Sequence, residues 1–196
     1  AIRAVPLPNS VAPALRFDPR LPGEAFPAGC PVAGSSAESP VERPADLEEL
    51  AFASIAELSH LLRTRKVGSV ELTEMVIGRL RRFDPLLHCV VTLTEERALA
   101  HAREADRELA AGRWRGPLHG IPWGAKDLFA VKGYPTTWGA APFMSQSVHE
   151  DATVVRRLDE AGAVLVAKLT LGALASGDVW FGGQTCSPWN LGDGSS

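Results

Sequence analysis

Lys126 is the first residue in this sequence whose type and surroundings could support catalysis. It follows the apolar segment 120–125 (GIPWGA) and precedes Leu128 and Phe129. A lysine held among apolar groups loses hydration, which favours its neutral amine over the charged ammonium. A neutral amine can act as a general base toward a hydroxyl nucleophile. Lys126 is therefore a candidate catalytic residue.

From these residues alone, a structural interpretation of Lys126 is favoured over the catalytic one. Lys126 could end a strand with its ammonium in water, paired with the neighbouring Asp127. Lys168 also follows an apolar segment, 163–167 (AVLVA), so the same local argument applies to it. Lys168 is therefore the natural control for any role given to Lys126.

The second candidate is the loop 187–196 (SPWNLGDGSS), which carries the hydroxyls of Ser195 and Ser196. Glycine-rich backbone can turn its amides inward, and such loops bind anions or form oxyanion sites, although most are simple turns. A phosphate-binding loop would need Gly-Lys followed by a hydroxyl residue. Here Lys126 follows Ala125 and precedes Asp127, which excludes that motif.

Other chemistries find less support. The three cysteines have no C-x-x-C spacing, and the five histidines form no H-E-x-x-H pair, so a zinc site is not expected. His119 is expected to be structural. Cys186 lies in the loop before Ser195 and leaves a cysteine hydrolase as a minor alternative. The net charge of −3 argues against a basic nucleic-acid face.

No membrane segment is expected. The longest apolar run, 161–175, contains Lys168 and is too short to span a bilayer. No signal peptide is visible, and the start at Ala1 leaves open whether upstream residues have been removed. The sequence assigns no location; a cytoplasmic one is slightly favoured, and an exported bacterial enzyme is the alternative.

The composition changes near residue 45. Nine of the 15 prolines lie in residues 1–45, which we interpret as an irregular arm, either docked or disordered. Residues 46–196 form the folded part. Helical periodicity, caps and glycine stops predict helices from Ser54, from Ser69 to a point before Pro85, over 94–111 and over 151–161, with Val154, Val155 and Leu158 facing inward. Strands are predicted at 88–93, 120–125 and 163–167. This order favours a layered α/β fold.

Three segments in order then resemble the amidase signature family. They are 116–127 (GPLHGIPWGAKD), the helix and strand over 151–168, and 183–190 (GQTCSPWN) with 194–196 (GSS). The resemblance extends from about Ser54 to the last residue. It implies a mixed, twisted sheet covered by helices, truncated here at the C-terminal side.

The same resemblance implies hydrolysis of amides through a Ser–Ser–Lys triad and an acyl-enzyme, with no metal or organic cofactor. Lys126 matches the lysine, and Ser195 matches the bridging serine, which follows a cis peptide bond in the family. The acyl-forming serine is expected beyond residue 196, so residues 1–196 alone are expected to be inactive and to keep Ser195 trans or disordered. The loop has Asp193-Gly194 where many members have Gly-Gly, and it is shorter after Trp189. Both departures suggest a subfamily variant.

The implied partner is a small-molecule amide, and a homo-oligomer is possible. Two alternatives remain. One is an amidotransferase component of the same family, which acts on charged tRNA within a complex. The other is a non-catalytic fragment that serves in binding or assembly.

Overall fold

The computed structural model describes residues 41–195. The predicted arm 1–45 therefore lies almost entirely outside the described residues. Of its last residues, Val41 packs against a core cluster that includes Leu61 and Leu72. Arg43 donates to the Lys66 carbonyl at 3.2 Å and to the Glu71 carboxylate at 2.8 Å. These residues belong to the compact unit that continues to the end of the chain.

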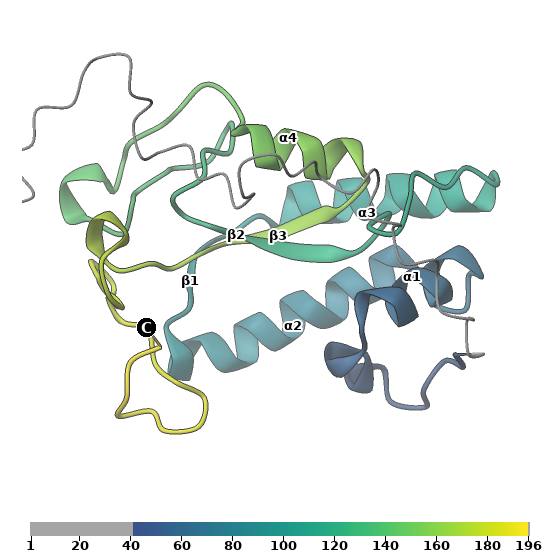
Figure 1. Ribbon diagram of the computed structural model, residues 1–196, viewed down its shortest axis with the longest axis horizontal. Helices are drawn as coiled ribbons and strands as arrows, with labels where there is room; N and C mark the ends of the chain where they lie inside the picture. The colour runs from purple at the N-terminus through teal and green to yellow at the C-terminus, as the bar shows by residue number, and fades with distance from the viewer. Residues whose placement is uncertain (1–40, 196) are drawn as a thin grey trace, which may run out of the picture. The chain divides into compact units, whose positions relative to one another are not determined.

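A three-stranded mixed sheet forms the centre of the described part (Figure 1). Its strands are β1 (Val90–Leu93), β2 (Pro122–Lys126) and β3 (Val164–Leu169). The order is β1-β3-β2, with β3 antiparallel to β1 and parallel to β2. Because β3 is central, its residues 164–168 are all buried, as its continuous apolar sequence predicts. The predicted mixed sheet is confirmed.

Helices cover both faces of this sheet, with α2 and α4 on opposite sides in Figure 1. Ala98 and Ala102 of α3 and Ile77 of α2 pack with Val164 and Val166 of β3 on one face. On the other face, Val155 of α4 packs with Ala125 and Leu165. The α-helices are α1 (Ile55–Arg63), α2 (Ser69–Leu87), α3 (Glu95–Ala110) and α4 (Thr153–Glu160). Shorter elements are the 3-10 turns η2 (Leu47–Phe52), η3 (Ala141–Phe143) and η4 (Ala173–Ala175) and the hairpin β4 (Val179–Trp180) with β5 (Gly183–Gln184).

Several helix ends lie where the sequence predicts them. Ser54 caps α1 in a capping box with Glu57. Thr94 precedes α3, and its hydroxyl donates to the Leu165 carbonyl at 2.7 Å, which ties the start of this helix to β3. Gly112 follows α3 and Gly162 follows α4, both with positive φ. Local capping rules therefore locate these ends correctly.

Two local predictions are wrong. The helix from Ser69 does not end before Pro85, because Pro85 lies inside the last turn of α2. There its missing N–H removes only one helical hydrogen bond, and the Asp84 carboxylate closes the end by accepting from the amides of Cys89 and Val90, both at 2.8 Å. Val154 does not face inward: it is exposed, since in this short helix Val155 is the residue that meets the sheet.

Among residues 41–195, no helix combines the length and the apolar composition that crossing a membrane requires.

Candidate active site

Lys126 is the last residue of β2 and pairs with Leu169 at the end of β3. Side chains alternate across a strand, so Ala125 and Asp127 are buried on one face while Lys126, between them in sequence, is exposed on the other. Leu128 is also exposed. The apolar surroundings expected for the Lys126 amine are therefore not provided by residues 41–195. Its amine forms no hydrogen bond or ion pair with any residue in that range.

Asp127 pairs with Lys168 and not with Lys126. The Lys168 Nζ lies 2.5 Å from Asp127 Oδ1, and both side chains are fully buried. Lys168 also donates to the Pro135 carbonyl at 2.8 Å and to Thr136 Oγ1 at 3.2 Å. The alternative of a Lys126–Asp127 pair is therefore wrong. The signal that could have revealed this contact is a charge inside an otherwise apolar strand, since a buried charge needs a partner.

Ser195 lies in the loop after β5 and is held by its backbone. Its amide donates to the Thr185 carbonyl at 3.0 Å. The Thr185 hydroxyl is 2.7 Å from the hydroxyl of Thr170, the residue that follows β3, and donates to the His88 carbonyl at 3.2 Å. The loop is thus fastened to the end of β3, beside the residue that pairs with Lys126. The structure brings both candidates to the same end of the sheet, but no hydrogen bond joins their side chains.

The peptide bond between Gly194 and Ser195 is trans, as expected for residues 1–196 alone; residues 41–195 contain no cis peptide bond.

Two contacts constrain the loop before Ser195, although residues 188–193 are exposed. Asp193 accepts from Asn190 Nδ2 at 2.9 Å, so the side chain that departs from the family's Gly-Gly pattern closes a local turn. A Cβ atom at Gly194 would lie 1.3 Å from Asp178 Oδ2, a distance that no real Cβ atom tolerates. Glycine is therefore required at 194 while the Asp178 carboxylate stays in place.

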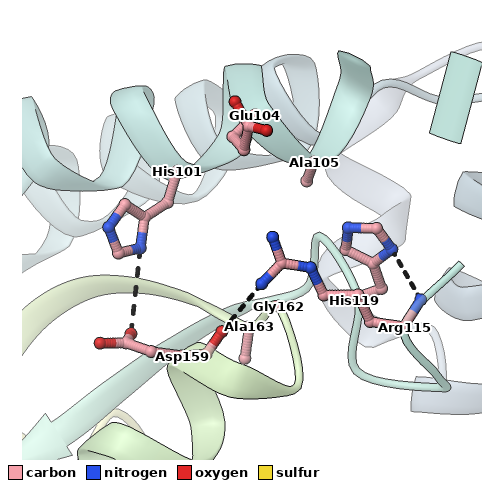
Figure 2. A pocket seen from close by; sticks show the side chains of 8 residues that line it. All are labelled: His101, Glu104, Ala105, Arg115, His119, Asp159, Gly162 and Ala163. Atoms are coloured by element: carbon pink, nitrogen blue, oxygen red, sulfur yellow. Dashed lines mark hydrogen bonds and ion pairs between the residues drawn. The ribbon is translucent and has the colours of Figure 1, made fainter. Parts of the chain in front are cut away.

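A cavity of about 150 Å³ lies at the other end of the sheet (Figure 2). Ala163, which lines it, comes directly before β3, whereas Lys126 ends the parallel strand β2. The polar groups around the cavity largely contact one another. Arg97 pairs with Asp159 at 2.5 Å, and Arg115 donates to the Asp159 carbonyl at 3.3 Å. This cavity is therefore separate from the candidate catalytic end.

His119 lines the cavity and is structural, as its sequence context predicts. It is almost fully buried, and its Nδ1 accepts from the Arg115 amide at 3.2 Å. Its Nε2 lies 3.1 Å from Glu108 Oε2. Burial lowers the pKa of His119, and the Glu108 carboxylate acts in the opposite direction.

Metal and cysteine chemistry gain no support from the described residues. Within residues 41–195, no three His, Cys, Asp or Glu side chains cluster in a way that could hold a metal ion. The Cys186 thiol contacts the Gln184 carbonyl at 3.5 Å and no histidine of that range.

Comparison with known proteins identifies the family. The amidase family model matches residues 71–195. A glutamyl-tRNA(Gln) amidotransferase component from Methylococcus capsulatus is 42% identical over 140 residues, which are 70% of this chain and 29% of the relative. Putative amidase AmiD of Mycobacterium tuberculosis is 39% identical over 137 residues, again 70% of this chain and 29% of the relative.

Solved structures agree with the sequence comparison. The native peptide amidase of Stenotrophomonas maltophilia superposes with a TM-score of 0.67 and 34% identity, covering 74% of this chain and 31% of that one. An amidase family protein from Bacillus anthracis gives a TM-score of 0.70 at 25% identity, over 76% of this chain and 32% of that one. The chain thus spans less than a third of the length of these relatives. Its sequence and fold show that it belongs to the amidase signature family.

Proposed function

We propose that Lys126 and Ser195 serve in the hydrolysis of a carbon–nitrogen amide bond through a Ser–Ser–Lys triad. The observation that carries the proposal is their common location. Lys126 ends β2, and hydrogen bonds through Thr185 fasten the Ser195 loop to the residue after β3. In a sheet with parallel neighbours, side chains from separate segments can converge at the carboxyl ends of the strands. The acyl-forming serine of this triad is expected beyond residue 196.

The proposed reaction moves two protons in the first step. The acyl-forming serine attacks the amide carbonyl carbon and gives its hydroxyl proton to Ser195 Oγ, while Ser195 gives its own proton to the neutral amine of Lys126. As the carbon–nitrogen bond breaks, Ser195 gives one proton to the leaving nitrogen and takes one back from Lys126, whose amine becomes neutral again. Water hydrolyses the resulting acyl-enzyme by the same relay and releases a carboxylic acid. The sequence predicts no cofactor for these steps.

The exposure of Lys126 bears on this chemistry. A general base works best when its neutral form is populated near the working pH, which for lysine requires loss of hydration. Residues 41–195 leave the Lys126 side chain exposed. In this proposal, the part of the family fold that carries the acyl-forming serine also covers Lys126.

We infer a small-molecule amide as the substrate, since the structural neighbours include a peptide amidase. A second candidate is a component of an amidotransferase, because a relative with that name shares 42% identity with this chain. The two differ in the fate of the ammonia: a hydrolase releases it into solution, whereas an amidotransferase would pass it to a glutamyl-tRNA.

The experiment uses the natural full-length polypeptide that contains residues 1–196. Ammonia release from benzamide and from a C-terminally amidated dipeptide is measured for the wild type and for Lys126→Ala, Ser195→Ala and Lys132→Ala. We expect the first two variants to lose activity and Lys132→Ala, an exposed control, to keep it. Residues 1–196 alone are expected to show no turnover.

Two results would contradict the hydrolase proposal. Full activity of Lys126→Ala would remove the lysine from the mechanism. A wild-type protein that releases no ammonia from these amides, yet forms amide on glutamyl-tRNA with a glutamine donor, would establish the amidotransferase function. Absence of both activities, with the tRNA assay run in the presence of the protein's natural complex partners, would favour a role in binding or assembly.

A further inference from the structure

We propose that Asp127 and Lys168 are positioning residues for the amine of Lys126. This inference rests on the proposed function, in which Lys126 is the base. It assigns to the buried ion pair the task of fixing the end of β2, from which the Lys126 side chain projects. Neither residue of the pair is placed in contact with the substrate.

The pair joins three segments of the chain at one point. Asp127 follows β2, Lys168 belongs to β3, and the Asp127 carboxylate also accepts from the amide of Thr137 at 2.8 Å and from its hydroxyl. Lys168 holds the same loop through the Pro135 carbonyl and Thr136 Oγ1. Both partners are fully buried, so water cannot replace any of these contacts. Charged groups without solvent need a nearly complete set of partners, which holds the geometry of the junction.

The junction acts on Lys126 through the backbone. The Lys126 side chain has no partner of its own among residues 41–195, so in this range only the backbone of β2 fixes the position from which the side chain extends. The next peptide is fixed by the Asp127 amide, which donates to the Leu169 carbonyl at 2.8 Å, and the Trp138 amide donates to the Asp127 carbonyl at 3.3 Å. Because side chains alternate, the Asp127 carboxylate holds the strand on one face while Lys126 projects from the other.

A purely structural ion pair is the competing interpretation, and Glu108 provides the matched control. Glu108 is also a buried carboxylate, 6% exposed, and accepts from Arg115 Nε and Nη2, both at 2.6 Å. It lies by the cavity at the opposite end of the sheet, beside His119. Asp127→Asn and Glu108→Gln each replace one buried carboxylate by an amide of the same shape. Only the first lies next to Lys126.

The first readout is the turnover of the natural full-length polypeptide on benzamide. A displacement of about 1 Å can reduce a rate by about a hundredfold. We expect Asp127→Asn to lower kcat by about 30- to 100-fold with a KM change below about threefold, and Glu108→Gln to change kcat by less than about threefold. Equal losses of kcat in both variants, at matched folded fraction, would overturn the proposal.

The double variant Asp127→Asn/Lys168→Met keeps the experiment decisive if the single variants fold poorly. It removes both charges together and so leaves no unpaired ion in the interior. If its thermal stability recovers while its kcat stays low, the ion pair positions Lys126. If kcat recovers together with stability, the pair is only structural and the proposal is wrong.

The second readout does not depend on activity. The rate at which Lys126 reacts with acetic anhydride is measured across pH by mass spectrometry, with exposed Lys132 as the internal standard. We expect Asp127→Asn to change the acetylation rate of Lys126, relative to that of Lys132, by about threefold or more. Glu108→Gln should leave this relative rate unchanged. An unchanged rate in Asp127→Asn overturns the positioning role. Activity that survives Lys126→Ala overturns the proposed function instead, so the two failures are distinguishable.

Discussion

A buried carboxylate lies at each end of the β2–β3 pair, Glu108 of α3 at the amino end and Asp127 at the carboxyl end, but in different surroundings. At the amino end, Glu108 contacts Arg115 and Arg113, whose side chains are 27% and 69% exposed, so this cluster keeps contact with water. At the carboxyl end, Asp127 and Lys168 are both 0% exposed. A pair without solvent tolerates little displacement, because an uncompensated buried charge is costly. The rigid junction is also the one beside the candidate catalytic lysine.

The largest effect on activity should come from substituting Lys126, and a comparison with Lys168, at the same end of the sheet, tests its role. In the natural full-length polypeptide, Lys126→Ala should lower amide hydrolysis on the order of 10⁴-fold, because it removes the base of a triad. It should leave the midpoint of thermal unfolding nearly unchanged, since Lys126 is the last residue of β2 and its amine pairs with no residue of the range 41–195. Lys168→Ala breaks the positioning junction, so it should lower kcat by only about 30- to 100-fold and should also lower stability. Kinetic assays and thermal melts of both variants test this, and equal losses of kcat at equal stability would contradict the assignment.

The sequence predicts the local parts of this structure well. The Ser54 cap, the glycine stops and the apolar β3 segment each depend on a few adjacent residues, and all are confirmed. The end of α2 differs from its prediction because Asp84 closes the helix one turn later and so allows Pro85 inside it. The assignment of Lys126 and Ser195 depends on family resemblance, and it stays a prediction.

The part that could not be predicted depends on contacts between distant segments. Asp127 stands next to Lys126 in sequence, yet the pleat places the two on opposite faces, and Asp127 meets Lys168 instead. Likewise, an apolar neighbourhood in sequence did not bury Lys126, because Leu128 and Phe129 are 42% and 37% exposed. Burial is set by what packs over a strand end, and local sequence does not contain that information.

A stability comparison should show the next largest effect. Lys168→Ala leaves the Asp127 carboxylate buried without its ion, and breaking a buried pair in this way costs about 3–5 kcal/mol in the free energy of unfolding. Arg113→Ala removes a partner of Glu108 that is 69% exposed and should cost less than about 1 kcal/mol. Urea unfolding of the two variants measures the difference. Similar costs would show that the two ends of the sheet do not differ as proposed.

In the Ser195 loop, one substitution should cause a smaller loss of stability, and a second substitution should partly restore it. Gly194→Ala would place a methyl group on the Asp178 carboxylate, which is the movable end of a partly exposed side chain, so the variant should cost no more than about 1 kcal/mol. Because the loop carries Ser195, the variant should also lose amide hydrolysis. Adding Asp178→Ala removes the obstructing atoms and should restore part of both stability and activity. A double variant no better than Gly194→Ala would show that this contact does not set the loop.

The smallest effect concerns the amino end and depends on pH. Burial lowers the pKa of His119 in the folded protein, so the unfolded chain binds this proton more readily. The free energy of unfolding therefore keeps the full His119 contribution above the unfolded-state pKa of about 6.5 and loses it as pH falls below that value toward the lower folded-state pKa. Urea unfolding at pH 7.5 and 5.5 should show this decrease in the wild type and in His149→Asn, an exposed control, and a smaller decrease in His119→Asn.

If the free energy of unfolding of His119→Asn falls as much as that of the wild type, another group dominates the pH response. Because His119 precedes β2 whereas Lys126 ends it, the substitution should leave the pH profile of kcat unchanged. That result would separate the titration at the amino end of the sheet from the chemistry at the carboxyl end.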